Sequence, residues 1–331
     1  MEQRYLERIA DNVLRTSLEA SGAVLIEGAK WCGKTRTAEQ IAASTLYLQD
    51  PDHTESYLKA ASVKPSLLLK GATPRLIDEW QMAPVMWDAV RFAVDRRRKS
   101  GQFILTGSAV PRDNAVQHTG TGRISRMIMR PMSLFESLES SGAVSLGALF
   151  GGTTSGECIS TLSIERLAFA LARGGWPASV VEPKSNIALR RVYDYVEAVI
   201  NFDVQRADEV EKSPARVRAL MRSLARNTST QANFVTIRDD MAADESTLTE
   251  KTIGSYLNVL RRIFVVEDLP AWSPAMRSKT PLRTTPKRHF IDPSIAVAVL
   301  RASPEKLLSD FNTFGLLFES LCVRDLRVYT Q

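Results

Sequence analysis

The chain has 331 residues, 44% of them hydrophobic and 24% charged, with a formal net charge of +6. It is long for one domain and has enough apolar residues for two or three packed cores. Its three cysteines, Cys32, Cys158 and Cys322, are scattered and odd in number, which argues against a disulfide framework and favours a reducing compartment. With no C-x-x-C pair, the cysteines do not indicate a metal site.

No uninterrupted apolar run approaches the roughly 20 residues that span a bilayer. We therefore expect a soluble, cytoplasmic protein with no membrane partner. The moderately basic charge allows a polyanionic partner without requiring one.

Residues 1–20 have apolar side chains at helical spacing, and this predicted helix leads into an apolar strand at 23–26. The next segment, 28–35, reads Gly-Ala-Lys-Trp-Cys-Gly-Lys-Thr and is followed by a helix-like stretch at 36–43. Its two glycines allow the backbone to fold around an anion, with amide groups and the helix N-terminus directed at a β-phosphate.

Within this segment, Lys34 would add positive charge beside the β- and γ-phosphates, and Thr35 would offer its hydroxyl to Mg²⁺. We therefore predict that ATP and Mg²⁺ bind here. The alternative is an ordinary glycine turn, which the flanking strand and helix disfavour. The predicted nucleotide contacts are Gly28, Ala29, Lys30, Trp31, Cys32, Gly33, Lys34, Thr35 and Arg36.

A second strand is predicted at 44–49, and a third, ending in Asp78 and Glu79, at 74–79. In a doubly wound parallel sheet, side chains at the C-terminal ends of strands lie beside the phosphates. Asp78 would belong to the Mg²⁺ shell, and Glu79 would orient or deprotonate the attacking water. The alternative is a helix cap, which is the commoner meaning of Asp-Glu after apolar residues.

A helix is predicted from Pro84 to the basic cluster 96–99, which is best interpreted as a solvated helix end. The following strand, 102–108, ends in hydroxyls. Thr106 or Ser108 could hydrogen-bond the γ-phosphate or the attacking water, although Thr-Gly-Ser is also common in turns.

Arg123 follows a glycine pair and precedes another predicted strand. Such a cation could reach a phosphate in the same subunit or in a neighbouring one, which would imply a homo-oligomer. The alternative is an exposed arginine with no catalytic part.

The order of these motifs resembles that of the AAA-like ATPases of bacteria and archaea that carry a C-terminal domain of unknown function. The resemblance covers nearly the whole chain, but its later motifs are recognisable mainly by their order. The motifs are the phosphate loop, 77–81, 103–108, 120–123, 129–134, 173–177, 193–206, 256–264, 286–292 and 314–319.

The resemblance implies a chain of four parts. An α/β P-loop NTPase domain with a parallel sheet flanked by helices would occupy 1–150, followed by a helical connector at 151–210. A mostly helical winged-helix-like domain would occupy 211–285, and an α/β nuclease-like module would begin at 286. Relatives continue past 319 into strands with an Asp and a Glu-x-Lys, whereas this chain stops at Gln331, so we expect an incomplete module at 286–331. Asp292 and Glu319 match its beginning, but two carboxylates alone do not make a metal-dependent nuclease site.

The winged-helix expectation also has support in the residues themselves. Thr249 should cap a helix whose apolar stripe runs from Ile253 to Phe264. Two polar faces carry residue types that contact DNA, although charged stripes are usually solvated. They are Arg218, Arg222 and Arg226 on one helix and Lys251, Ser255, Asn258 and Arg262 on the other. Segments 264–269 and 289–291 could flank a wing.

The leading hypothesis is a Mg²⁺-dependent ATPase that couples hydrolysis to motion of the winged-helix region, with Lys34, Glu79, Thr106 and Arg123 as catalytic residues. The alternative is a nucleotide-gated DNA-binding regulator with little turnover. A small-molecule kinase is a third possibility, disfavoured because no arginine-rich lid or acceptor motif follows the phosphate loop.

Overall fold

The computed structural model describes residues 5–108, 119–153, 158–207, 212–242, 249–275, 277, 279 and 284–331. The chain divides into two compact units, which we call the N-terminal unit (Met1–Met129 with Gln331) and the C-terminal unit (Arg130–Thr330). The first unit thus ends before residue 150, where the sequence suggested a boundary. The intervening segment bonds within the C-terminal unit, because the Met132 amide donates to the Gly175 carbonyl at 2.6 Å.

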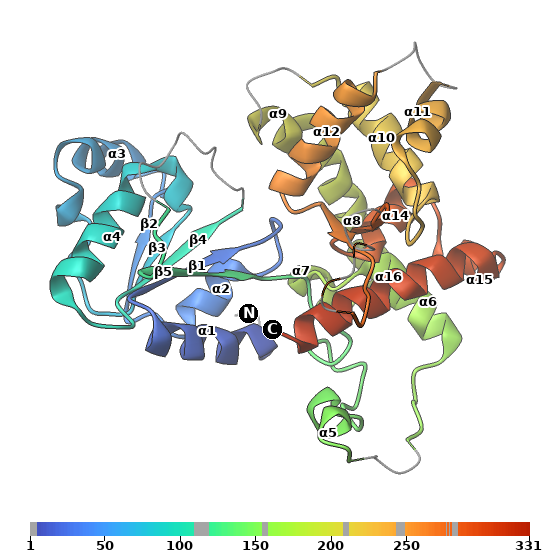
Figure 1. Ribbon diagram of the computed structural model, residues 1–331, viewed down its shortest axis with the longest axis horizontal. Helices are drawn as coiled ribbons and strands as arrows, with labels where there is room; N and C mark the ends of the chain where they lie inside the picture. Colours follow the sequence, from blue (N-terminus) through green and yellow to red (C-terminus); the bar gives the residue numbers. More distant parts are fainter. Residues whose placement is uncertain are drawn as a thin grey trace. The chain divides into compact units, whose positions relative to one another are not determined.

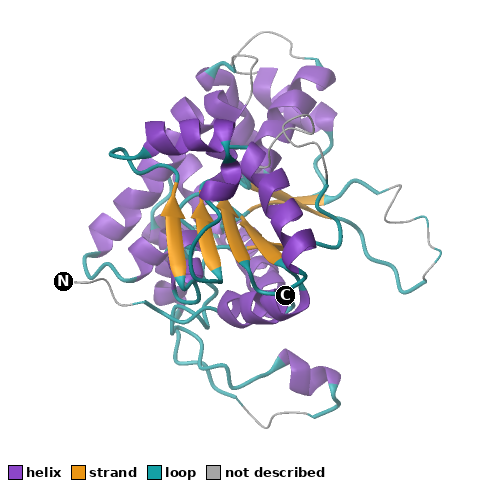
Figure 2. Cartoon of the chain, turned by 90° about the vertical axis from the view of Figure 1, so that its left-hand side faces the viewer, coloured by secondary structure: helices purple, strands orange, loops and turns teal. Residues whose placement is uncertain are grey.

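The N-terminal unit is built on a five-stranded sheet in the order β2-β3-β4-β1-β5 (Figure 1). All neighbouring strands pair in parallel, and they lie side by side in Figure 2. The strands are β1 (Ala23–Glu27), β2 (Ser44–Tyr47), β3 (Arg75–Asp78), β4 (Phe103–Gly107) and β5 (Ile124–Ile128). This confirms the predicted α/β fold with a parallel sheet.

Helices cover both faces of the sheet. Successive residues of a strand point to opposite faces, so each strand contributes side chains to two cores. Ala23 and Leu25 of β1 belong to the core beneath α3 (Thr54–Val63) and α4 (Val85–Arg97). Val24 and Ile26 belong to a second core, beneath α1 (Ile9–Ala20) and α2 (Lys34–Glu39). Two short 3-10 helices complete the unit, η1 (Pro65–Leu67) and η2 (Trp80–Met82).

The C-terminal unit is mostly helical. Its N-terminal helices are α5 (Leu146–Phe150), α6 (Ile164–Arg173), α7 (Pro177–Val180), α8 (Ser185–Ala198), the π-helix η3 (Val199–Asp203) and α9 (Val204–Ala207). They are followed by α10 (Pro214–Arg226), α11 (Phe234–Ala242), α12 (Glu250–Arg262), α14 (Pro293–Val299), α15 (Pro304–Leu308) and α16 (Phe311–Tyr329). Every residue from Pro293 to Ala298 is buried, and α14 packs against α6, α8, α10 and α16. A helix that is buried on all sides lies in a core, so α14 is the centre of this unit.

The helices α10, α11 and α12 pack against one another. The hydroxyl of Thr249 accepts from the Thr252 amide and caps α12, as predicted. Two antiparallel strands follow, β6 (Val266–Leu269) and β7 (Lys287–Phe290). They lie close to the segments predicted to flank a wing.

A buried ionic network joins the two ends of the C-terminal unit's sequence. Asp292 is fully buried and accepts hydrogen bonds from the amides of Gly175 and Ser294, each at 2.9 Å. Its carboxylate also pairs with Arg324 at 2.7 Å, and Arg324 pairs with Asp325. Asp292 is therefore a structural cap of α14.

This arrangement bears on the expected nuclease-like module. Glu319 pairs with Lys287 at 2.6 Å, while the Asp292 carboxylate is already bonded as above. Within the described ranges, no group of three or more His, Cys, Asp or Glu side chains is placed to hold a metal ion. In the same ranges, no helix is both long and apolar enough to cross a membrane.

Replacing Asp292 tests the network. Asp292→Ala should lower the free energy of unfolding by about 3–5 kcal/mol, because it leaves the Arg324 guanidinium buried beside a single carboxylate. Denaturation by urea, followed by far-UV circular dichroism, measures the change. Asp310→Ala is the matched control, because Asp310 also caps a helix but is solvated. Equal losses in the two variants would contradict a role for the buried pair.

Candidate functional site

The loop between β1 and α2 curves because two glycines adopt positive φ angles. Gly28 has φ 151° and Gly33 has φ 104°. A Cβ at Gly28 would lie 2.1 Å from the Met129 carbonyl oxygen, so a larger residue could not occupy this position without displacing the neighbouring strand. The loop therefore requires glycine where the predicted motif has it.

Lys34 is buried and its ammonium group lies within the curve of the loop. Its Nζ donates to the carbonyl oxygens of Gly28 at 2.9 Å and Ala29 at 2.8 Å. An anion entering the loop would compete with these two carbonyls for the same cation. The geometry thus keeps a positive charge at the place where the sequence predicts a phosphate.

The Thr35 hydroxyl donates to Asp78 Oδ1 at 2.7 Å. These residues come from α2 and β3, far apart in the sequence, and the parallel sheet brings them to the same edge. Hydroxyl and carboxylate oxygens are suitable ligands for Mg²⁺. Asp78 is only 1% exposed, so its carboxylate requires hydrogen-bonding partners.

Two further donors satisfy the Asp78 carboxylate. Thr106 at the end of β4 donates to Oδ1, and Gln49, just after β2, donates to Oδ2. The strand order explains the contact between Thr106 and Asp78. Strand β4 lies between β1 and β3, so its last residues lie beside both the loop and the acidic pair. Thr106 is fully buried, and its hydroxyl bonds both Asp78 Oδ1 and the Glu79 amide.

Glu79 has a left-handed backbone, with φ 55°, directly after β3. Its amide donates to Thr106 Oγ1 at 3.2 Å. Its carboxylate accepts from the Gln81 amide and from the Ser108 hydroxyl, the latter at 3.4 Å. The turn therefore separates the two acidic side chains: Asp78 bonds the Thr35 hydroxyl and Glu79 bonds Ser108.

The remaining loop residues lie on the surface or behind the loop. Trp31 is 55% exposed and Cys32 is buried. Arg36 pairs with Glu39 on the same helix at 3.1 Å, and Lys30 has an intermediate exposure. The ligand contacts predicted for these residues remain predictions.

Two charged residues beside the loop were not predicted from the sequence. Arg8 is buried and donates to the Cys32 carbonyl at 2.9 Å. Glu27, the last residue of β1, pairs with Arg126 at 3.3 Å; its burial raises the pKa, and Arg126 opposes this rise. Both look like solvated charges in the sequence, because nothing local indicates that they are buried.

Gln49 and Gln81 were also missed. Gln49 follows β2 and Gln81 follows β3, so the rule that placed Asp78 at the sheet edge could have identified both. The predicted strand at 44–49 included Gln49 as an ordinary strand residue, but β2 ends at Tyr47.

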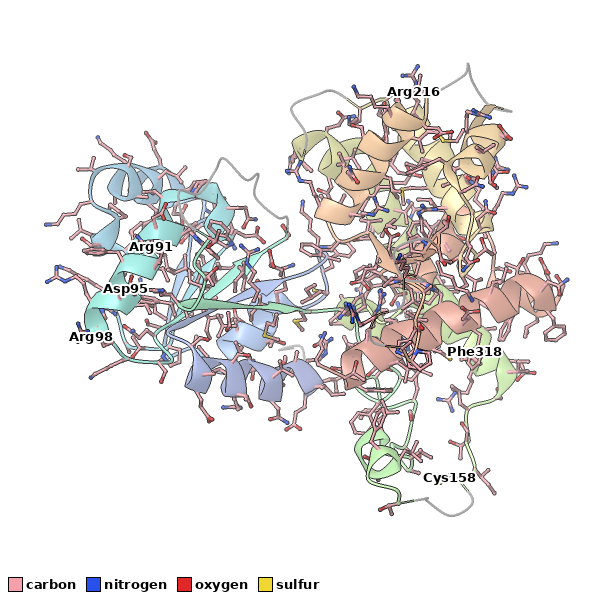
Figure 3. The ribbon with its side chains drawn as sticks, viewed as in Figure 1. Arg91, Asp95, Arg98, Cys158, Arg216 and Phe318 are labelled. Atoms are coloured by element: carbon pink, nitrogen blue, oxygen red, sulfur yellow. The ribbon has the colours of Figure 1, made fainter. Side chains whose placement is uncertain are left out.

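Arg123 lies at the opposite end of the strands from the phosphate loop. In the parallel register Ile124 pairs with Ala23, so Arg123 is beside the start of β1 whereas the loop follows its end. Five strand residues separate these points by roughly 16 Å. Arg123 instead pairs at 2.8 Å with Asp95, which Figure 3 labels on α4. The contact of Arg123 with a phosphate remains a prediction, and its pairing with Asp95 favours the neighbouring-subunit alternative over the same-subunit one.

The predicted DNA-contacting faces of α10 and α12 are partly neutralised within the chain. Arg218 pairs with Glu197 at 2.7 Å, and Arg226 with Asp240 at 3.1 Å. Ser255 accepts from Lys212, and Asn258 accepts from Arg261. Among the described residues, no partner is found for Arg222, Lys251 or Arg262.

Comparisons with known proteins agree with this geometry. Residues 20–138 match a family described as an AAA domain, and residues 164–306 match a domain of unknown function, DUF8612. No curated protein matches the sequence.

Among solved structures, the Walker-type ATPase PABY2304 of Pyrococcus abyssi aligns with a TM-score of 0.55 and 14% identity, over 90% of this chain and 97% of that one. The replication initiator DnaA, bound to AMPPCP and single-stranded DNA, aligns with a TM-score of 0.35 and 14% identity, over 78% and 90% of the two chains. The ORC1 protein of Aeropyrum pernix in complex with DNA gives 0.33 and 11%, over 90% and 93%. Only the first score is high enough to indicate a shared fold.

The parallel sheet, the loop after β1 and the match to an AAA domain together define an α/β protein with an AAA-like P-loop NTPase fold. The C-terminal unit includes the domain of unknown function.

Proposed function

We propose that the N-terminal unit binds ATP with Mg²⁺ and hydrolyses it. The observation that carries the proposal is the 2.7 Å hydrogen bond between Thr35 and Asp78. It joins a hydroxyl at the end of a glycine-bounded loop to a buried carboxylate, and together these are the oxygen ligands that a P-loop NTPase uses for Mg²⁺. The ion would neutralise charge on the phosphates when bound.

The chain's own residues would bind the phosphates, activate the water and position the acidic groups. Lys34 would transfer its hydrogen bonds from the Gly28 and Ala29 carbonyls to phosphate oxygens. Glu79 would accept a proton from the attacking water, with Gln81 and Ser108 orienting its carboxylate. Thr106 would act as a positioning residue, because its hydroxyl bonds both Asp78 and the Glu79 amide.

The C-terminal unit would respond to the nucleotide. We propose that hydrolysis is coupled to motion of a winged-helix region formed by α10, α11, α12 and the β6-β7 ribbon. Support for the winged-helix interpretation comes from the order of three packed helices and an antiparallel ribbon. Hydrogen exchange of α10–α12 that does not differ between the ATP-bound and ADP-bound protein would refute the coupling.

Lys34→Ala should weaken Mg·ATP binding about 10- to 100-fold, because it removes a charge-assisted contact to phosphate. Calorimetric titration measures the affinity. The matched control is Lys59→Ala, which removes an exposed lysine from α3 and should leave the affinity unchanged. Equal affinities for the Lys34 variant and the wild type would place the nucleotide elsewhere.

Glu79→Gln should keep the affinity for ATP and lower turnover by at least about 100-fold, because the amide cannot act as a base. Phosphate release measures turnover, and Glu55→Gln on the exposed face of α3 serves as the control. A Glu79 variant with the wild-type rate would show that another group activates the water. A wild-type protein that binds ATP without turnover would favour the second function below.

Arg123 pairs with Asp95 at the opposite end of β1 from the loop, so its proposed role is to complete the site of a neighbouring subunit. We propose this role in a homo-oligomer. Arg123→Ala and Lys34→Ala should each be inactive alone, and a mixture of the two should regain part of the activity, because one intact site can form between unlike subunits. Full activity of Arg123→Ala alone would remove the residue from the mechanism.

The second candidate function is a nucleotide-gated DNA-binding regulator with little turnover. The ribbon after α12 favours it, as do the unpartnered cations Lys251 and Arg262 among the described residues. Each of Lys251→Ala and Arg262→Ala should reduce the salt slope of duplex DNA binding by about one unit, as measured by fluorescence anisotropy. Arg226→Ala is the control, because Asp240 already neutralises this arginine. Absence of DNA binding at low salt by the folded wild type would exclude this function.

A further inference from the structure

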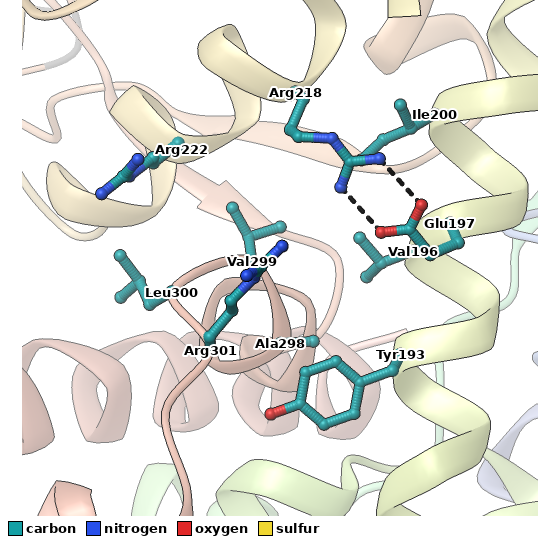
Figure 4. A pocket seen from close by; sticks show the side chains of 10 residues that line it. All are labelled: Tyr193, Val196, Glu197, Ile200, Arg218, Arg222, Ala298, Val299, Leu300 and Arg301. Atoms are coloured by element: carbon teal, nitrogen blue, oxygen red, sulfur yellow. Dashed lines mark hydrogen bonds and ion pairs between the residues drawn. The ribbon is translucent and has the colours of Figure 1, made fainter. Parts of the chain in front are cut away.

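The C-terminal unit contains a cavity that the proposed nucleotide site does not use. Its volume is about 310 Å³, within the usual size range of small-molecule sites. Helices α8 and α10 and the end of α14 form its walls (Figure 4). The polar lining consists of Tyr193, Glu197, Arg218, Arg222 and Arg301.

The charges in this cavity do not balance. Arg218 donates to both oxygens of Glu197, at 2.7 and 2.8 Å, so this pair is neutral. Within the described part of the chain, the side chains of Arg222 and Arg301 form no hydrogen bond or close ion pair. The hydrogen bond from Arg218 lowers the pKa of the Glu197 carboxyl, and Arg301 lies near enough to Glu197 to help lower it. The cavity lining therefore carries a net charge of +2, from two guanidinium groups whose donors are available to a ligand.

Arg301 occupies a position that suits glycine. It has φ 53° directly after the end of α14, and its amide donates to the Ala298 carbonyl at 3.0 Å. An L-residue is strained in this left-handed conformation, which glycine adopts freely at helix ends. In Figure 4 the Arg301 side chain extends from the end of α14 toward the Glu197–Arg218 pair. The backbone at Arg301 thus places a cation on the cavity wall at the cost of a left-handed conformation.

The rest of the lining is apolar, with Val196, Ile200, Val299 and Leu300 among the contributing residues. Apolar walls of this kind can contact the organic group of a small molecule. A nucleic-acid backbone, by contrast, is bound through cations and would not use these walls. Arginine forks bind phosphate oxygens in a bidentate manner, and a phosphomonoester carries a charge of about −1.5 to −2 at pH 7.

We propose that the cavity between α8, α10 and the end of α14 binds a small organic phosphomonoester, with the phosphate on Arg222 and Arg301 and the organic group against the apolar wall. This site lies entirely within the C-terminal unit and does not depend on nucleotide binding in the other unit. It would give that unit a small-molecule ligand of its own.

Phenyl phosphate is a suitable probe, titrated calorimetrically into the full chain carrying Lys34→Ala, so that the phosphate loop contributes little. In this background, Arg301→Gly and Arg222→Ala should each weaken binding at least about tenfold. Arg226→Ala, on the same helix but paired with Asp240, should not. Arg301→Gly should also keep or raise the melting temperature, because glycine relieves the left-handed strain. This separates loss of binding from loss of folding.

The affinity for phenyl phosphate should fall as the pH decreases from 7.5 to 5.5, because the phosphate loses its second charge near pH 6 while arginine stays charged. Either of two results would overturn the proposal: no binding of phenyl phosphate, or binding that Arg301→Gly and Arg222→Ala leave unchanged. A short duplex oligonucleotide that binds through the same two arginines while phenyl phosphate does not would also overturn it, in favour of a nucleic-acid contact.

Discussion

The N-terminal unit depends on the satisfaction of one buried charge, the Asp78 carboxylate. A carboxylate that is almost fully buried is costly unless donors surround it. Here the donors come from Thr35 on α2, from Thr106 at the end of β4 and from Gln49 after β2. Because each donor belongs to a different element, the same hydrogen bonds that stabilise Asp78 hold the phosphate loop in register with the sheet edge.

The backbone turn at the end of β3 determines where the Glu79 side chain lies. A continuing strand would point it to the opposite face of the sheet from Asp78. The left-handed turn at Glu79 instead keeps its carboxylate within reach of Ser108, which directly follows β4. The backbone conformation that leaves the strand thus brings the proposed base beside the proposed nucleotide site.

Buried charge organises the C-terminal unit in a comparable way. Asp292, Arg324 and Asp325 bond one another and the backbone of segments that are distant in the sequence. The carboxylate that resembled the start of a metal site is thereby used as a helix cap. By contrast, the side chains of Arg222 and Arg301, which line the cavity, form no close ion pair among the described residues, so a ligand can add binding energy there.

The sequence by itself determined the local features: the glycine-bounded loop, the strand ending in Asp78 and Glu79, and the helix capped by Thr249. Each rests on residues that are close in the chain, where backbone preferences and side-chain spacing act directly. Only the tertiary structure decided which side chains meet. The parallel register placed Arg123 at the opposite end of the strands from the loop, and strand order placed Thr106 beside Asp78. Packing neutralised Arg218 and Arg226 while burying Arg8. Such pairings depend on contacts between distant segments, which no local pattern specifies.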